Sequence, residues 1–462
     1  MLKSIIRKEL LEIFLSFRFA LALIMVITLF STSAVIFNRQ YNNRIESYRM
    51  GMNSNLDALK KASVRLSEVA NLDQRLYLKP SVLEFIADGG EDKIWNAWIL
   101  NAFSFRIPSR AQSVNWLLHP FDSLNFQFLI SVILSFIVLI FTFDAITGEK
   151  RDGTLKLVLG NSISRTTVIL GKFVSSLISI ALILLAGFLL GLALILANKN
   201  IVLTGQAWLK ILTFLIISLF YLSSLLLLGL LISSLTRNSV TSFFICMFLW
   251  LILVIVAPLA GNLLAPHFRP AISLEEMSKK MRAANQEIWQ SAPEGAGGYN
   301  GSPTYPKMRQ RTELINRLDE SANQIKLDYI RKLITQAQGA TTLSVYSPAT
   351  IFRSSTEILA GSGLNHFAHF IEQGIIYQNK LLQFIKSKDS GDPDSYHFVQ
   401  SWHPEAFSQK AVSLAEILQF EDKPRALGEI LGLLIRGVGY LFFLNILFFA
   451  ASFFSFIRYD VR

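Results

Sequence analysis

Six long runs of apolar residues alternate with polar segments along the chain. The runs cover approximately residues 19–37, 126–143, 173–197, 211–235, 240–261 and 437–457. Each run is long enough for a helix to cross about 30 Å of hydrocarbon at about 1.5 Å per residue. The pattern therefore predicts an all-α membrane protein with six transmembrane helices.

The two longest polar segments, 38–125 and 262–436, contain more than half of the chain and are too long to be loops. We expect them to form a mainly helical domain outside the membrane, built from two insertions. The first insertion ends in an aromatic group, Trp95, Trp98, Phe103, Phe105 and Trp116. These rings could lie at the level of the lipid headgroups or form the core where the two insertions meet, and we favour the core.

The second insertion begins with an amphipathic pattern over about 273–290. A Gly-, Pro- and Ser-rich segment at 291–306 cannot hold regular structure, and a long charged helix is predicted over about 308–338. Two antiparallel helices flanking a loop are the simplest arrangement. No long alternating strand pattern is visible, although the sequence leaves room for a small sheet.

The basic residues near the ends of the runs predict an orientation with both termini in the cytoplasm, because short cytoplasmic segments carry an excess of Lys and Arg. The residues concerned are Lys3, Arg7, Lys8, Arg18, Lys150, Arg151, Lys156, Arg165, Lys172, Arg237, Arg458 and Arg462. The short loop 198–208 on the other side carries only Lys199. Both insertions are then extracytoplasmic, and the tail 458–462 is cytoplasmic.

Residues 1–18 predict an amphipathic helix that lies flat at the inner membrane surface. Apolar residues recur there at steps of three and four, and the polar positions include Arg7, Lys8 and Glu9. Two alternatives remain. The segment could simply extend the first run, or it could begin a signal peptide, although the 19 uncharged residues of 19–37 exceed a usual signal sequence.

Charge and cysteine content narrow the classes of function. The formal net charge of +11 could suggest nucleic-acid binding, but basic residues beside the membrane account for much of it. The single cysteine, Cys246, lies in the fifth run. Neither insertion can therefore form an internal disulfide or a thiolate metal site.

The sequence contains few residues that could form a catalytic or metal-binding site. The histidines, His119, His267, His366, His369, His397 and His403, all fall on the predicted outer side. His366 and His369 share a helix face, but a metal would need a further ligand such as His397, His403 or Glu372, and the segment reads HFAH rather than HExxH. We therefore expect capping or packing histidines and no metal site.

The sequence has no GxxxxGK[ST] motif, and its nearest echo, Gly171-Lys172-Phe173, lacks the upstream glycine and the hydroxyl. The chain cannot by itself hydrolyse ATP through a P-loop, and we predict that it is not an enzyme. Ionisable residues are nearly absent from the runs, which argues against a self-powered secondary transporter. Gly187 and Gly191 form a GxxxG pattern that favours a close helix contact.

The predicted cytoplasmic segment between the second and third runs, 144–172, is the most specific feature. It reads FDAITGEKRDGTLKLVLGNSISRTTVILGKF from Phe143 to Phe173. Acidic residues lie just after the second run, an apolar face around Leu155 follows, and basic residues precede the third run. The segment predicts a short helix parallel to the membrane with a charged side for a cytoplasmic partner; a merely structural loop is the alternative.

These residues resemble the permease subunits of type 2 ABC exporters. The family's first coupling helix is marked by an acidic residue, a Gly-Thr-Leu step, a Ser-Arg pair and a Gly-Lys pair. Here these are Glu149, 153–155, 164–165 and 171–172, and the amphipathic start resembles the family's elbow helix. The resemblance covers residues 1 to about 261 and the sixth run. A bacterial subgroup with large extracytoplasmic insertions is similar at 347–349, 359–361 and 456–462.

The resemblance implies a transporter in the bacterial cytoplasmic membrane whose permease and ATPase are separate subunits. Two permeases, identical or paralogous, would form a dimer, and two separate ATPase subunits would bind ATP and Mg and dock on the coupling helices; the chain itself would bind no cofactor. The residues assigned to ATPase coupling are Glu149, Lys150, Arg151, Asp152, Gly153, Thr154, Leu155 and Arg165, with Arg7, Lys8 and Glu9 of the elbow helix as a second contact. Lys150, Arg151 and Asp152 are expected to be surface charges, and Leu155 a packing anchor.

Three functions remain open. The chain could export a lipid-like, peptide or otherwise amphipathic substrate. Alternatively, it could be a mechanotransmission subunit that moves an extracytoplasmic partner while nothing crosses the membrane. A membrane-anchored enzyme that uses the outer histidines is the third hypothesis.

Overall fold

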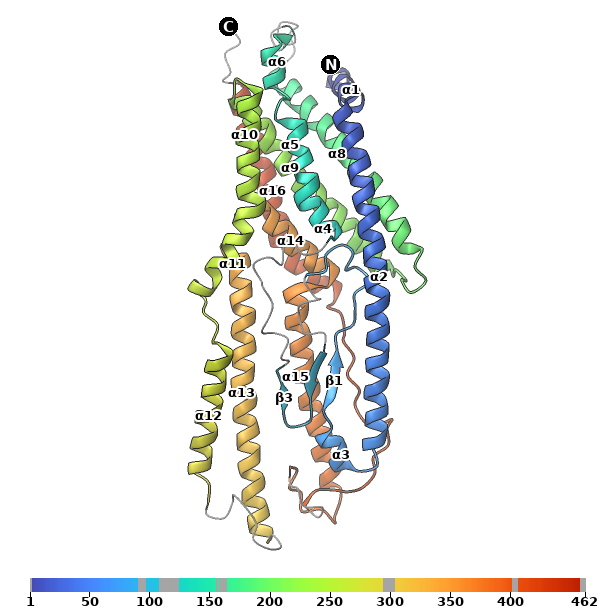
Figure 1. Cartoon of the computed structure of the whole chain (residues 1–462), viewed down its shortest axis with the longest axis vertical. Coiled ribbons are helices and arrows are strands. Elements are labelled where there is room, and N and C mark those ends of the chain that lie inside the picture. Colours follow the sequence, from blue (N-terminus) through green and yellow to red (C-terminus); the bar gives the residue numbers. More distant parts are fainter. Residues whose placement is uncertain are drawn as a thin grey trace.

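The chain folds into an elongated, mostly helical molecule in a computed structural model that describes residues 2–89, 97–107, 124–154, 157, 164–293, 304–400 and 406–457 (Figure 1). Six helices of the described part are long and apolar enough to cross a membrane: Phe17–Ala62, Phe126–Arg151, Arg165–Leu196, Gly205–Leu235, Ser239–Phe268 and Leu427–Ile457. They coincide with the six runs and confirm that prediction.

The N-terminal amphipathic segment is a helix of its own. Helix α1 (Leu2–Phe14) ends before α2 (Phe17–Ala62), and Ser16 separates the two. The Ser16 hydroxyl donates to the carbonyl of Ile13 at 2.6 Å and accepts from the backbone N–H of Phe19 at 3.2 Å, so it closes one helix and caps the next. Residues 1–18 therefore do not simply extend the first run.

Helix α2 continues without a break for 46 residues, about 69 Å at about 1.5 Å per residue. Its first half is apolar and its second half belongs to the polar region (Figure 1). The third span, α8 (Arg165–Leu196), packs along it through small residues. A Cβ at Gly191 would lie 3.2 Å from the carbonyl oxygen of Phe30, and one at Gly187 would lie 2.8 Å from Val26 Cγ1. The GxxxG pattern therefore makes the predicted close contact.

Two spans contain a turn of π-helix. The second span consists of α4 (Phe126–Phe128), η4 (Leu129–Leu134) and α5 (Ser135–Thr142), and the fifth of α10 (Ser239–Trp250), η5 (Leu251–Val256) and α11 (Ala257–Phe268). In both π segments a backbone carbonyl accepts a hydrogen bond from a side chain of another segment. Tyr221 of α9 (Gly205–Leu235) donates to the carbonyl of Ser131 at 2.8 Å, and Ser347 donates to that of Leu253. Such partners stabilise the wider turn in an apolar setting.

The polar region contains a small antiparallel sheet that an all-α prediction does not include. Its order is β1 (Gln74–Tyr77), β2 (Ala97–Leu100), β3 (Phe105–Arg106), and α3 (Leu66–Asn71) precedes it. Strands of four, four and two residues are too short to produce a visible alternating pattern. The sheet packs on α15 (Gly363–Ser390), where a Cβ at Gly374 would lie 2.4 Å from the ring of Trp98.

Residues from both insertions form one core in this region. Trp98 and Phe105 are fully buried, with ring centroids 5.0 Å apart, in a cluster that also contains Phe370, Leu381 and other residues of the second insertion. The structure thus supports the core interpretation for these aromatic residues. Trp95 and Trp116 lie outside the described residues.

The two helices predicted in the second insertion are present. Helix α12 (Leu274–Gln290) starts at a capping box formed by Ser273 and Glu276. Helix α13 (Tyr305–Leu343) is longer than predicted and runs beside α12 (Figure 1). At its far end α13 meets the fifth span, where a Cβ at Gly261 would lie 2.5 Å from the carbonyl of Ala340.

Helix α14 (Pro348–Ala360) is the part of the second insertion that packs among the spans. It contacts α9 and α16 (Leu427–Ile457), and Phe352 stacks on Tyr221 with centroids 4.7 Å apart and 12° between the rings. Both rings are fully buried in the core of the membrane-spanning part. The second insertion is therefore not wholly separate from the spans.

Candidate functional site

The predicted coupling segment, the elbow helix and the ends of three spans meet at one end of the molecule. Helix α6 (Thr147–Arg151) follows the second span, and Figure 1 shows it at the same end as α1 and the start of α8. Four segments that are far apart in the sequence are joined there by side-chain hydrogen bonds. The contacts begin at α8.

Lys172, in the second turn of α8, joins α1 to α6. Its Nζ lies 2.9 Å from Glu9 Oε1 and 2.8 Å from Glu149 Oε1, and its side chain is only 4% exposed. The preceding Gly171 lets α1 approach, because a Cβ there would lie 2.6 Å from Ile5 Cγ2. A buried ammonium with two carboxylates is costly to break, so this triad fixes α1 and α6 relative to α8.

Lys150 has a different role from the predicted surface charge. Its Nζ donates to the carbonyls of Ser234 at 2.7 Å and Thr236 at 3.0 Å, at the end of α9. These carbonyls are otherwise left over at a helix C-terminus, where a cation is favourable. The expectation for Lys150 is therefore corrected, because its ammonium connects α6 to the fourth span.

Serine and threonine residues complete the junction. Ser233 Oγ accepts from the backbone N–H groups of Ile146 at 3.0 Å and Thr147 at 3.1 Å, which satisfies donors at the start of α6. Ser239, at the start of α10, donates to Thr147 Oγ1 at 3.2 Å. The sequence interpretation missed Ser233, because nothing in its own neighbourhood indicates a partner 86 residues away.

Arg165, assigned to ATPase coupling, also contacts a span. Its guanidinium donates to the carbonyls of Phe456, at 3.2 Å, and Ile457 at the end of α16. On the other side of the junction, Arg18 lies 2.9 Å from Asp144 Oδ2. Arg165 therefore links the coupling segment to the sixth span, as Lys150 links it to the fourth.

The surface left for a partner is formed by residues 151–154, which are all exposed. Arg151 Nε lies 2.9 Å from Asp152 Oδ1, and Gly153 adopts a positive φ of 73° that suits glycine. Leu157 is 71% exposed. Leu155, the predicted packing anchor, and 158–163 lie outside the described residues. On α1, Arg7 and Lys8 are exposed, whereas Glu9 faces Lys172.

His366 and His369 both contact the loop that contains Asp422 and Lys423. His366 Nε2 lies 3.5 Å from Asp422 Oδ2, and His369 Nε2 lies 3.1 Å from the carbonyl of Lys423. Burial disfavours the Asp422 carboxylate, but the hydrogen bond and charge of His366 outweigh it and lower the pKa of Asp422. Among the described residues no group of three His, Cys, Asp or Glu side chains could hold a metal. His119 and His403 lie outside them.

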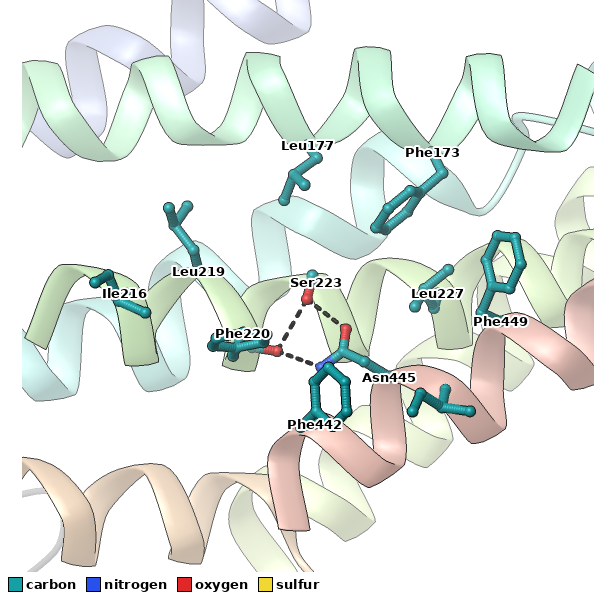
Figure 2. A pocket seen from close by; sticks show the side chains of 11 residues that line it. Phe173, Leu177, Ile216, Leu219, Phe220, Ser223, Leu227, Phe442, Asn445 and Phe449 are labelled. Atoms are coloured by element: carbon teal, nitrogen blue, oxygen red, sulfur yellow. Dashed lines mark hydrogen bonds between the residues drawn. The ribbon is translucent and has the colours of Figure 1, made fainter. Parts of the chain in front are cut away.

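An apolar cavity of about 530 Å³ opens between α8, α9 and α16 (Figure 2). Phenylalanine, leucine and isoleucine side chains form most of its wall, and Asn445 is its one amide. Asn445 Nδ2 donates to the carbonyls of Phe220 at 2.9 Å and Leu441 at 2.8 Å, while its Oδ1 accepts from Ser223. The polar groups are thus satisfied internally, and the open surface suits an acyl chain or another apolar group.

These features define a multi-pass helical membrane protein in which the short helix α6 contacts the ends of several spans. The chain belongs to the ABC-2 family of transporter proteins, because the model of that family matches residues 3–461. A comparison with curated proteins found no matching sequence. The family defines a membrane permease subunit of an ABC transporter, which works with an ABC ATPase.

Proposed function

We propose that a separate ATPase dimer, which binds ATP and Mg, docks on α6, on residues 151–154 and on the exposed side of α1. This end of the molecule would lie in the cytoplasm of a bacterial cell, with both chain termini, and the polar region would lie outside the cytoplasmic membrane. The Lys172 triad carries the proposal, because it makes α1 and α6 one unit with α8. Force on either docking element then reaches a span directly.

Two further contacts extend this unit. Lys150 of α6 holds the end of α9, and Arg165, the first residue of α8, holds the end of α16. A displacement of the exposed residues 151–154 would therefore move three spans together. This arrangement supports a rigid-body movement more than a local loop rearrangement.

The polar region is connected to the first and second spans by a second junction. Arg44 of α2 pairs with the buried Glu84 at 2.6 Å, and the backbone N–H of Phe126 at the start of the second span donates to the carbonyl of Phe85 at 3.0 Å. Ser362, before α15, donates to the carbonyl of Ala87 at 2.6 Å. Loop 81–89 thus touches α2, the second span and the polar domain.

We therefore favour a mechanotransmission subunit, in which ATP-driven movement of the spans displaces the polar domain and acts on an extracytoplasmic partner. The continuous helix α2 and loop 81–89 support this function. Only 22% of the most apolar stretch is buried in the fifth span and in the sixth span. Within the permease dimer that the family resemblance implies, the exposed faces of these two spans would meet lipid or a second copy.

Export of a lipid-like or amphipathic substrate is the second candidate. The apolar cavity between α8, α9 and α16 supports it, because a hydrophobic substrate could lie against these spans. The two functions predict different responses to ATP. Export requires that a labelled substrate change sides, whereas mechanotransmission requires only that the polar domain move.

The decisive experiment uses the intact chain with a candidate P-loop ATPase from the same genome, co-expressed and reconstituted in lipid vesicles. Nitroxide labels at Lys199→Cys, in the loop between the third and fourth spans, and at Lys279→Cys of α12, with Cys246→Ser as background, report the movement of the polar domain relative to the spans. We expect ATP to change the distance between labels without flux of a fluorescent lipid. Failure of the ATPase to co-purify would refute the docking proposal, and lipid flux at a fixed distance would favour export.

A further inference from the structure

A second cavity, of about 350 Å³, lies where the spans meet the polar region. Its wall is built from residues 79–83, the end of α14, the start of α15, the start of α9 and residues 424–433 at the start of α16. Six side chains that line it are charged or can become so: Lys79, Lys210, Glu357, His366, Asp422 and Arg425. The balance of their charges indicates what the cavity can bind.

Both acids in the wall already have partners. Glu357 Oε1 accepts from Arg353 Nε at 2.8 Å, and Asp422 faces His366 at 3.5 Å and accepts from Gln373 at 3.0 Å. The cations are not balanced in this way. Lys210 Nζ has no hydrogen-bond or ion-pair partner in the described part of the chain, and the buried Nε of Arg425 has no hydrogen-bond partner there either.

Two helices add positive potential to the same space. Helices α9 and α16 both begin in the wall of the cavity, with Gln206 and Ala207 of α9 and Ile430 of α16 among its lining. The N-terminus of a helix carries a partial positive charge and free N–H groups, which favour anions. Together with Lys210 and Arg425, these helix ends favour a negatively charged group in the cavity, although α16 also carries Glu429 in its first turn.

The rest of the wall is apolar and reaches the surface. Val202 is 75% exposed and Leu433 is 41% exposed, and both line the cavity beside the start of a span. The volume lies within the range of about 300–1,000 Å³ that is usual for ligand sites. A ligand with an anionic head and an apolar chain matches the two kinds of surface.

We propose that this cavity binds the phosphate-bearing headgroup of an anionic phospholipid, with its acyl chains leaving past Val202 and Leu433. Lys210 and Arg425 contact the phosphate. A bound lipid there touches α9, α16 and the polar region together, so it would strengthen the junction between spans and domain. The proposal does not depend on ATPase docking.

The test uses the purified full-length chain in a non-ionic detergent, with added phosphatidylglycerol, phosphatidylcholine or inorganic phosphate. Lipid retained on the protein is measured by native mass spectrometry, and the midpoint of thermal unfolding is measured in parallel. We expect the wild type to prefer phosphatidylglycerol over phosphatidylcholine by about tenfold or more, since charge-assisted contacts are the strong ones. The variant Lys210→Gln with Arg425→Gln should lose this preference.

Lys199→Gln with Arg436→Gln is the matched control, because both are exposed cations near the same spans that do not line the cavity. It should keep the preference, as should Lys210→Arg with Arg425→Lys, which shows that loss is not misfolding. Equal binding of both lipids by the wild type, or an unchanged preference in the glutamine variant, overturns the proposal. Displacement of the lipid by millimolar phosphate identifies free phosphate as the ligand and also overturns it.

Discussion

Lys172 of α8 and Glu149 of α6 meet at 2.8 Å, and Lys172 is at the same time 2.9 Å from Glu9 of α1. The lysine side chain is 4% exposed, and those of the two acids are 16% and 13% exposed. Two elements expected to contact an ATPase are thus fixed through one ammonium group. The stability of this end of the molecule and the ATPase coupling that we propose for it would therefore depend on the same three side chains.

Replacing Lys172 by Met should strongly destabilise this end of the protein. The change leaves Glu9 and Glu149 largely buried without a counter-charge, which costs about 3–5 kcal/mol when one partner of a buried pair is lost. The midpoint of unfolding in detergent and recovery of the ATPase should both fall. Lys8→Met is the control, because its pair with Glu12 is more than half exposed and worth about 1 kcal/mol or less.

The cost should shrink if the acids are neutralised as well. A variant with Lys172→Met, Glu9→Gln and Glu149→Gln should be more stable than Lys172→Met alone. If the single change leaves the unfolding midpoint within 1 °C of the wild type, the triad does not hold these helices together.

Charge reversal of the exposed pair Arg151 and Asp152 should weaken ATPase binding without affecting the fold. Among the described residues each of these two exposed side chains pairs with the other, so Arg151→Glu with Asp152→Lys changes the surface of this part of the chain. Surface charges at interfaces act mainly on association, and we expect a roughly tenfold loss of affinity in a detergent pull-down. Lys150 is unsuitable for this test, because its contacts with the end of α9 are structural.

Arg309 and Glu313 provide the matched control for that experiment. They form an exposed pair at the same distance of 2.9 Å on α13, far along the chain from the coupling segment. Arg309→Glu with Glu313→Arg should leave ATPase recovery unchanged. Equal recovery from both variants would place the docking surface elsewhere.

Substitution of Gly191 by Leu should separate the first and third spans. The new side chain would meet the carbonyl oxygen of Phe30, a backbone atom, and the ring of Phe126. Overpacking of this kind costs about 1–3 kcal/mol, measurable as a lower unfolding midpoint in detergent. Gly439→Leu on α16 is the control, since no atom lies within 4 Å of a Cβ there. Equal effects at both positions would contradict close packing of α2 and α8.

The polar region should lose stability in acid through Asp392. Hydrogen bonds from Lys410 and Ser408 lower the pKa of Asp392 from 3.8 to about 2. Because the folded-state pKa is the lower one, this contribution is complete above pH 3.8 and is lost as the pH falls towards about 2. Tryptophan fluorescence should show this loss in the wild type.

Asp392→Asn should be less stable than the wild type at neutral pH and should show a weaker pH dependence between pH 4 and pH 2. Asp394→Asn is the control, because Asp394 is 87% exposed and lies 4.0 Å from Lys410. An unaltered acid profile in the Asp392 variant would show that the Lys410 contact does not contribute.

The sequence is informative wherever a feature is local and repeated. The six spans follow from runs of apolar residues, and α12 follows from its amphipathic pattern, with Ser273 and Glu276 at its start. The sheet is missed because its longest strands have four residues. Helix α14 is missed as part of the spanning core because its Ser, Thr, Arg and Glu residues look solvent-exposed.

The candidate site is only partly predictable for a related reason. The coupling segment is visible in the sequence, but the contacts that make it rigid join residues far apart. Lys172 meets Glu9 over 163 positions, and Arg165 meets Phe456 over 291. Lys172 looks like a fragment of a nucleotide-binding motif when only its neighbours are considered. The burial of Lys172 and its pairing with two acids, which define its role, become apparent only in the folded structure, where α1 and α6 pack against α8.

Because α2 continues without a break into the polar region, a tilt at its first end is enlarged at its second. A stiff helix about 69 Å long that tilts by ~5° about its N-terminal end displaces its other end by about 6 Å. The tip, at Ala62, is buried beside the sheet and the core of the polar domain. In the mechanotransmission function that we propose, small tilts of the membrane-spanning half of α2 would thus become displacements of several ångströms in the polar region.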